Sequence, residues 1–261
     1  MKQEYDKFEN IIFYENEHSL FLNDFWNSTK SFILTSYIEL IDSIKTNKLL
    51  KHNFTQNEIK YLILLTKSYY QYQLSFFTLV EEHMGIVAFN SLRAAIEANR
   101  LLRAYYIDEE FRNQYLLNSN IDFRNGNDYS FMQKKVCKIL KEKESQIRSQ
   151  DKIPLTPILH NHDLIEGSTL SEMHSELSRW SHLLNSNLLE IPYISTRKIY
   201  LGIEDEYSYE MELLIKQYLE GSFLLIMEHL EMFANIIRNT NINNIQSEMI
   251  DKYSEYVRLF Y

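Results

Sequence analysis

The stretch IVAFNSLRAAIEANRLLRAYY, residues Ile86–Tyr106, decides the fold class of this 261-residue chain. Wound at about 3.6 residues per turn, it places its polar side chains in one narrow stripe and apolar side chains around most of the remaining circumference. The stripe consists of Asn90, Arg93, Glu97 and Arg100. A helix that is apolar nearly all round is usually buried, so we expect Arg93 and Glu97 to be held away from water, with Glu97 paired locally to Arg93 or to Arg100.

Helical spacing of apolar residues recurs in nearly every window of the chain, whereas strict alternation is rare. Only 5 Gly and 3 Pro are available for the turns that a sheet of hairpins needs. We therefore predict an all-α bundle of about seven or eight helices in a single domain, residues 1–261, with a weak boundary near 118–128. Expected helices cover residues 19–50, 57–83, 86–106, 129–148, 169–184, 207–239 and 244–260, with an N-cap at Thr55 and a bend at Gly85.

The overall charge and the single cysteine limit the partners and the compartment. The formal net charge of −9 repels nucleic acid unless basic residues gather locally. The basic segment 133–148 is one such gathering, but it also contains acidic residues, which favours an ordinary solvated face. Cys137 has no second cysteine for a disulfide, and no stretch resembles a signal peptide or a membrane span. We expect a cytoplasmic protein that does not enter a membrane.

A second stretch, TLSEMHSELSRWSHLL (Thr169–Leu184), is predicted to be an amphipathic helix with an unusual third side. Its apolar side holds Leu170, Met173, Leu177, Trp180 and Leu184. Beside that side runs a stripe of small polar and imidazole side chains, called here the Ser/His stripe: Ser171, His174, Ser178, Ser181, His182 and Asn185. A solvated face usually carries Lys, Glu or Gln. We therefore expect the Ser/His stripe to face Arg93 and Glu97 and to supply partners for buried polar groups.

The two stretches together predict a polar pocket, because an imidazole exchanges a proton near neutral pH and an arginine holds a phosphate or carboxylate in a fork. The candidate catalytic residues are Arg93, Glu97 and His182, and the candidate binding residues are Asn90, Arg100, His174, Ser178 and Arg179. The same residues also fit an internal ion-pair network that serves packing alone. Both interpretations stay open at the level of sequence.

Metal binding is the competing chemistry. The segment HNHD offers His160, His162 and Asp163 as ligands, and His174 and His182 share a helix face. The chain contains no HExxH motif and no Gly-rich phosphate loop, so we predict neither a metal nor a cofactor. Glu228 and His229, in the long helix expected over 207–239, are predicted to lie on a helix surface rather than to act as ligands.

The segments SLRAAIEA (Ser91–Ala98) and LSRWSHLL (Leu177–Leu184) resemble a pair found in uncharacterised bacterial helical proteins, where an Arg-x-x-x-Glu helix precedes a Leu-Ser-x-x-x-His helix. Those proteins are similar to the HEPN-like superfamily. The resemblance implies an antiparallel helical bundle, frequent homodimers and roles in toxin-antitoxin or antiphage defence systems. In active members an Arg followed more than one helical turn later by a His cleaves RNA without a metal.

Two functions follow from this resemblance. In an RNA-cleaving enzyme, His182 would act as general acid and base, Arg93 or Arg179 would stabilise the phosphorane charge, and Glu97 would orient either group. However, Arg179 precedes His182 by less than one turn, so the spacing of the active members is missing. This departure favours a binding module for a protein or nucleotide, with a homodimer, a protein partner or RNA as the expected partners.

Overall fold

A computed structural model describes residues 11–46, 54–117, 126–144, 166, 168–181, 209–237 and 240–261. Within these ranges the chain forms eight α-helices, a short π-helical turn and no strand, which confirms the all-α prediction. The elements are α2 (Ser19–Thr46), α3 (Gln56–Glu81), α4 (Gly85–Ile107), α5 (Glu109–Leu117), α6 (Gly126–Ile139), η1 (Leu140–Glu144), α8 (Thr169–Ser181), α10 (Tyr209–Ile237) and α11 (Thr240–Phe260). None of these helices is both long and apolar enough to cross a membrane.

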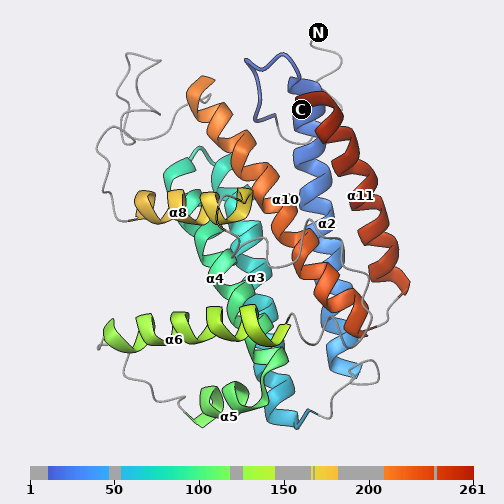
Figure 1. The fold of residues 1–261 in the computed structure, drawn as a ribbon. Helices are drawn as coiled ribbons and strands as arrows, with labels where there is room; N and C mark the ends of the chain where they lie inside the picture. Colours follow the sequence, from blue (N-terminus) through green and yellow to red (C-terminus); the bar gives the residue numbers. More distant parts are fainter. Residues whose placement is uncertain are drawn as a thin grey trace.

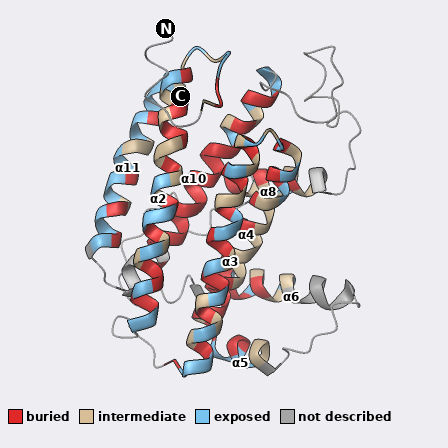
Figure 2. Cartoon of the chain, turned by 180° about the vertical axis from the view of Figure 1, so that it is seen from behind, coloured by how far each residue is buried: buried red, intermediate tan, exposed pale blue. Residues whose placement is uncertain are grey.

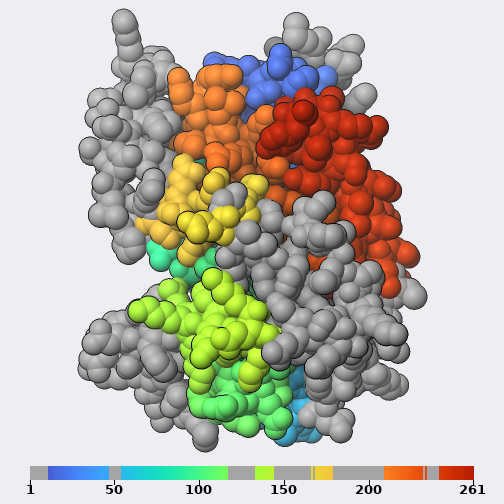
Figure 3. Space-filling view, in the orientation of Figure 1, coloured from blue at the N-terminus to red at the C-terminus, as the bar shows by residue number. Residues whose placement is uncertain are grey.

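Five long helices, α2, α3, α4, α10 and α11, run along the length of the molecule (Figure 1). Two shorter helices, α8 and α6, lie crosswise over α4, and both are visible on the face of the molecule in Figure 3. The α3–α4 hairpin makes the most extensive helix-helix contact, and α10 contacts α2, α4, α8 and α11. This arrangement covers most of α10 and leaves one edge of α4 beside α8.

The ends of α3 show how local sequence sets the helix boundaries. At its start, the Thr55 side chain accepts a hydrogen bond from the Glu58 amide and the Glu58 carboxylate accepts one from the Thr55 amide, so the expected N-cap is confirmed as a capping box. At its end, His83 has a φ of 57°. The amides of His83 and Met84 donate to the carbonyls of Val80 and Leu79, which is a Schellman motif. The reversal predicted at Gly85 therefore occurs at His83, and Gly85 begins α4.

Several other boundaries differ from the sequence prediction by a few residues. α6 begins at Gly126, inside the predicted linker, and passes into η1. α11 begins at Thr240, four residues before the expected start, because its side chains at Ile242 and Ile245 reach the core. α10 begins at Tyr209, two residues after the expected start.

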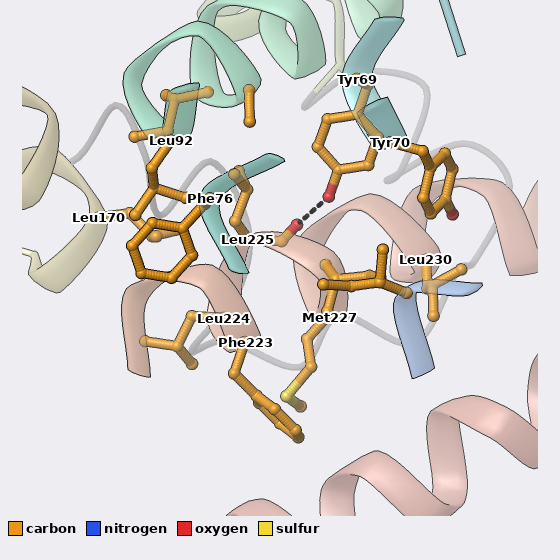
Figure 4. Close-up of a cluster of buried hydrophobic side chains, with 14 of the residues drawn as sticks. Tyr69, Tyr70, Phe76, Leu92, Leu170, Phe223, Leu224, Leu225, Met227 and Leu230 are labelled. Atoms are coloured by element: carbon orange, nitrogen blue, oxygen red, sulfur yellow. Dashed lines mark hydrogen bonds between the residues drawn. The ribbon is translucent and has the colours of Figure 1, made fainter. Parts of the chain in front are cut away.

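The core is organised around α10. Every residue from 218 to 231 of this helix is buried, as the continuous red ribbon in Figure 2 shows. In Figure 4 its Phe223, Leu224 and Leu225 pack with Phe76 of α3, Leu92 of α4 and Leu170 of α8. This buried stretch includes Glu228 and His229, so the prediction that they lie on a helix surface is wrong. The reason is that neighbouring helices cover α10 from several sides along this stretch.

Candidate functional site

The outer polar cluster consists of Arg93 and Glu97 on α4 and His174 on α8. The Arg93 Nε donates to the Glu97 Oε1 at 3.1 Å, one helical turn apart, so the expected pair forms. The His174 Nε2 lies 3.7 Å from the same Glu97 oxygen, beyond hydrogen-bond length. One carboxylate oxygen therefore lies between a guanidinium from its own helix and an imidazole from the crossing helix.

The packing of α8 explains why His174 faces Glu97. Leu170, Met173 and Leu177 form the buried stripe of α8 that the sequence predicts. Met173 rests on Gly221 of α10, where an added Cβ would lie 2.1 Å from the Met173 Sδ. Because His174 follows Met173 in the helix, this contact turns the imidazole toward α4. The hydroxyl of Ser178, a residue of the Ser/His stripe, donates a hydrogen bond to the His174 carbonyl at 2.8 Å.

The outer cluster is only partly covered. The Arg93 side chain is 21% exposed, and those of Glu97 and His174 are each 22% exposed. Asn90, one residue of the same stripe, is exposed, and Arg100 is half-buried. The expectation that Arg93 and Glu97 are held away from water is therefore wrong. α8 crosses α4 instead of running alongside it, so one edge of the stripe stays at the surface (Figure 1).

The other sequence candidates cannot be placed with the outer cluster. His182 lies outside the described residues, and Arg179 belongs to the last turn of α8, whose side chains there are also outside the description. His160, His162 and Asp163 lie outside it as well. In the part of the chain that the structure describes, no group of three or more His, Cys, Asp or Glu residues is arranged to hold a metal ion.

The chemistry of the outer cluster follows from its three groups. A guanidinium binds phosphate or carboxylate with directed hydrogen bonds, and the Glu97 carboxylate holds the Arg93 Nε. The three side chains are partly exposed, but the His174 Nε2 itself is buried. The guanidinium is therefore the group of this cluster that is suited to recognising an anion.

An inner polar cluster, whose side chains are buried, links Asn99 and Arg103 of α4 to α10. The Arg103 Nη1 lies 3.2 Å from the Glu228 Oε2, and both side chains are completely buried. The His229 Nδ1 lies 2.8 Å from the Asn99 Oδ1, and these side chains are also buried. A charged pair in such a position needs strong mutual attraction, because both ions have lost their hydration.

Aromatic and amide side chains from α3 close the inner cluster. The Tyr69 ring stacks on His229 at 4.2 Å between centroids, and its hydroxyl donates to the Leu225 carbonyl at 3.4 Å, the contact drawn in Figure 4. Gln73 donates to the Tyr69 hydroxyl and accepts from Ser222. Burial raises the pKa of Tyr69 well above its usual value, and the nearby Tyr70 adds to this effect. Burial and then the Arg103 charge lower the pKa of His229 well below its usual value.

The inner cluster was not predicted from the sequence. Its signal was present in SFLLIMEHLEMF (Ser222–Phe233), where Glu228, His229 and Glu231 interrupt an otherwise apolar run in the middle of a long helix. A helix that is apolar nearly all round is usually buried, and this holds for Ser222–Phe233 of α10 as it does for α4. Charges inside such a run belong to a core network.

Comparison with known proteins adds no relative: no protein-family model, no curated protein and no solved structure matches this chain. The class that the fold and the site define is an all-α helical protein with a partly exposed Arg/Glu/His cluster between α4 and α8.

Proposed function

We propose that this protein is a HEPN-like helical binding module that recognises the phosphate group of a nucleotide ligand at the outer cluster. The observation that carries the proposal is the convergence of Arg93, Glu97 and His174 from two crossing helices at the surface. The resemblance of the α4 and α8 segments to HEPN-like proteins supports it. In this proposal the protein is a cytoplasmic homodimer of a bacterial defence or toxin-antitoxin system.

Each residue has a separate role in the proposal. Arg93 supplies positive charge for the phosphate, and Glu97 holds the Arg93 Nε so that the guanidinium keeps its direction. His174 packs its imidazole beside the Glu97 carboxylate, from the crossing helix. Arg100, on the same stripe of α4, and Ser178 of α8 extend the binding surface, and Asn90 marks its exposed end. The net charge of −9 repels an anion from the molecule as a whole, so binding of an anion needs a local group of cations such as this one.

Binding of fluorescently labelled ATP and of a labelled oligoribonucleotide, followed by anisotropy, tests the proposal. We expect Arg93→Gln to weaken binding by about 10-fold or more, because it removes a charge-assisted contact. Glu97→Gln keeps an acceptor for the Arg93 Nε but removes the negative charge, so binding should be unchanged or tighter. Arg258→Gln, an exposed arginine on α11, is the matched control and should bind as the wild type does.

Two results would contradict the proposal. One is that the folded wild-type protein binds neither probe; the other is that Arg93→Gln and Arg258→Gln weaken binding of the probe by the same factor. Circular dichroism of each variant separates loss of binding from loss of fold.

A metal-independent ribonuclease is the second candidate, in which His182 acts with Arg93 or Arg179, and the outer cluster places a further imidazole, that of His174, 3.7 Å from the Glu97 carboxylate. Incubation of a mixed RNA pool with the protein in EDTA tests it. Cleavage that is lost in His182→Ala or His174→Ala, but kept in Arg258→Gln, would establish the enzyme and identify which histidine acts.

A further inference from the structure

His229 sits where α3, α4 and α10 meet, and its hydrogen bond identifies its protonated nitrogen. The Asn99 Oδ1 only accepts hydrogen bonds, so the His229 Nδ1, at 2.8 Å, carries the proton of the neutral ring. The lone pair then lies on Nε2, a buried atom that has no hydrogen-bond partner among the described residues. The neutral ring therefore fits its surroundings with one hydrogen bond and one unused acceptor.

The described groups packed around the ring are aromatic side chains, an amide and an ion pair. From α3, Tyr69 stacks on the ring and Tyr70 meets it edge-on at 5.3 Å. From α4, Asn99 holds Nδ1 and Arg103 contributes a positive charge. From α10 itself, Phe233 packs against the ring at 4.8 Å, and Glu228 is next in sequence but is engaged with Arg103.

We infer that His229 makes the core of this protein acid-sensitive, so that a proton on its Nε2 separates α10 from α3 and α4. The protonated ring would place a donor against aromatic carbon and a second positive charge beside Arg103, both without water. The contacts that would be lost are those joining α10 to the α3–α4 hairpin: Asn99 with His229, Arg103 with Glu228, and Tyr69 with Leu225. This inference does not depend on the proposed ligand.

The direction of the pH effect follows from linkage. Burial, and then the Arg103 charge, lower the pKa of His229 in the folded protein, whereas the unfolded chain takes up a proton near pH 6.5. Stability is therefore complete above that pH and falls as the pH drops toward the folded pKa, because only the unfolded state binds the proton there. One such group changes the unfolding equilibrium constant by about 10-fold per pH unit.

Urea unfolding of the full chain, repeated between about pH 7.5 and pH 5, tests the inference. In the wild type we expect the unfolding equilibrium constant to increase as the pH falls. In His229→Gln the constant should not change with pH over this range. The matched control is His18→Gln, which removes a partly exposed histidine of the N-terminal segment and should keep the wild-type slope. Equal slopes for the wild type and His229→Gln would overturn the inference.

A second variant and a direct measurement keep the inference testable if His229→Gln does not fold. Asn99→Asp replaces the amide oxygen by a carboxylate, which favours the protonated ring, so its slope should become smaller than that of the wild type. In the wild type, the ring resonances of His229 in NMR spectra should not shift down to the pH at which unfolding begins. A titration of His229 near pH 6.5 with the fold intact would overturn the inference.

Discussion

Helix α4 carries two polar clusters built from similar residues, and burial separates their roles. The outer cluster, Arg93 with Glu97 and His174, keeps about a fifth of each side chain in contact with solvent. The inner cluster, Arg103 with Glu228 and Asn99 with His229, has none. Exposed ion pairs contribute little to stability, whereas removing one partner of a buried pair leaves a charge without hydration. The partial exposure of the outer cluster is what the proposed ligand site requires, and the inner cluster is part of the fold.

The largest expected effect is at Arg103. Arg103→Met leaves the Glu228 carboxylate in the core without that guanidinium, and we expect a loss of about 3–5 kcal/mol in the free energy of unfolding. Urea denaturation measures it. The double variant Arg103→Met/Glu228→Met replaces both charges by apolar side chains and should recover most of the loss. A cost below about 1 kcal/mol for the single variant would place Arg103 in the same class as Arg93.

The next effect concerns the contact that aligns α8 with the outer cluster. Gly221→Ala places a methyl group where the Met173 side chain now lies, and we expect a net loss of about 1 kcal/mol. In the middle of a helix without such a neighbour, the same substitution would stabilise by roughly 0.5–1 kcal/mol. Thermal melting measures the sign, and hydrogen exchange shows whether α8 opens first. An increase in stability would mean that Met173 moves aside at no cost.

Acid titration compares His229 with two carboxyls outside both clusters. Burial alone would raise the pKa of Asp108, but Lys143, at 2.7 Å, and the Phe111 amide lower it. Burial likewise opposes the hydrogen bonds of Thr55 and Arg112, which together lower the pKa of Glu58. Their stabilisation is present above the unfolded pKa values and is lost as the pH falls through the folded ones, below about pH 4. Unfolding curves of His229→Gln should keep this lower limb. If the loss of stability below about pH 4 disappeared in His229→Gln, the assignment of this loss to Asp108 and Glu58 would be contradicted.

The smallest expected effect on stability is at the outer pair. Arg93→Gln should change the free energy of unfolding by less than about 1 kcal/mol, because both side chains are hydrated in part and lie on one helix. Urea denaturation at low and high salt measures the difference. A loss as large as that at Arg103 would show that the pair belongs to the core, and would remove the basis for a ligand site there.

The contacts that the sequence alone determined are local ones. The 3.6-residue period predicted the helices, the residue type of Thr55 predicted the N-cap of α3, and the four-residue spacing of Arg93 and Glu97 allowed their pair. Such contacts depend only on helix geometry, since residues three or four apart lie on the same face of any α-helix. The apolar stripe of α8 was predictable for the same reason.

Tertiary structure alone decided which polar residues are enclosed. Asn99 and His229 are 130 positions apart, and only the packing of α4 against α10 brings them together. Glu228 resembles any charged helix residue until its neighbours cover it, while Arg93 stays at the surface because α8 crosses α4 instead of running beside it. Burial is a property of the assembled helices. The sequence therefore determined which side chains share a helix face, and the packing of distant helices decided which of them water reaches.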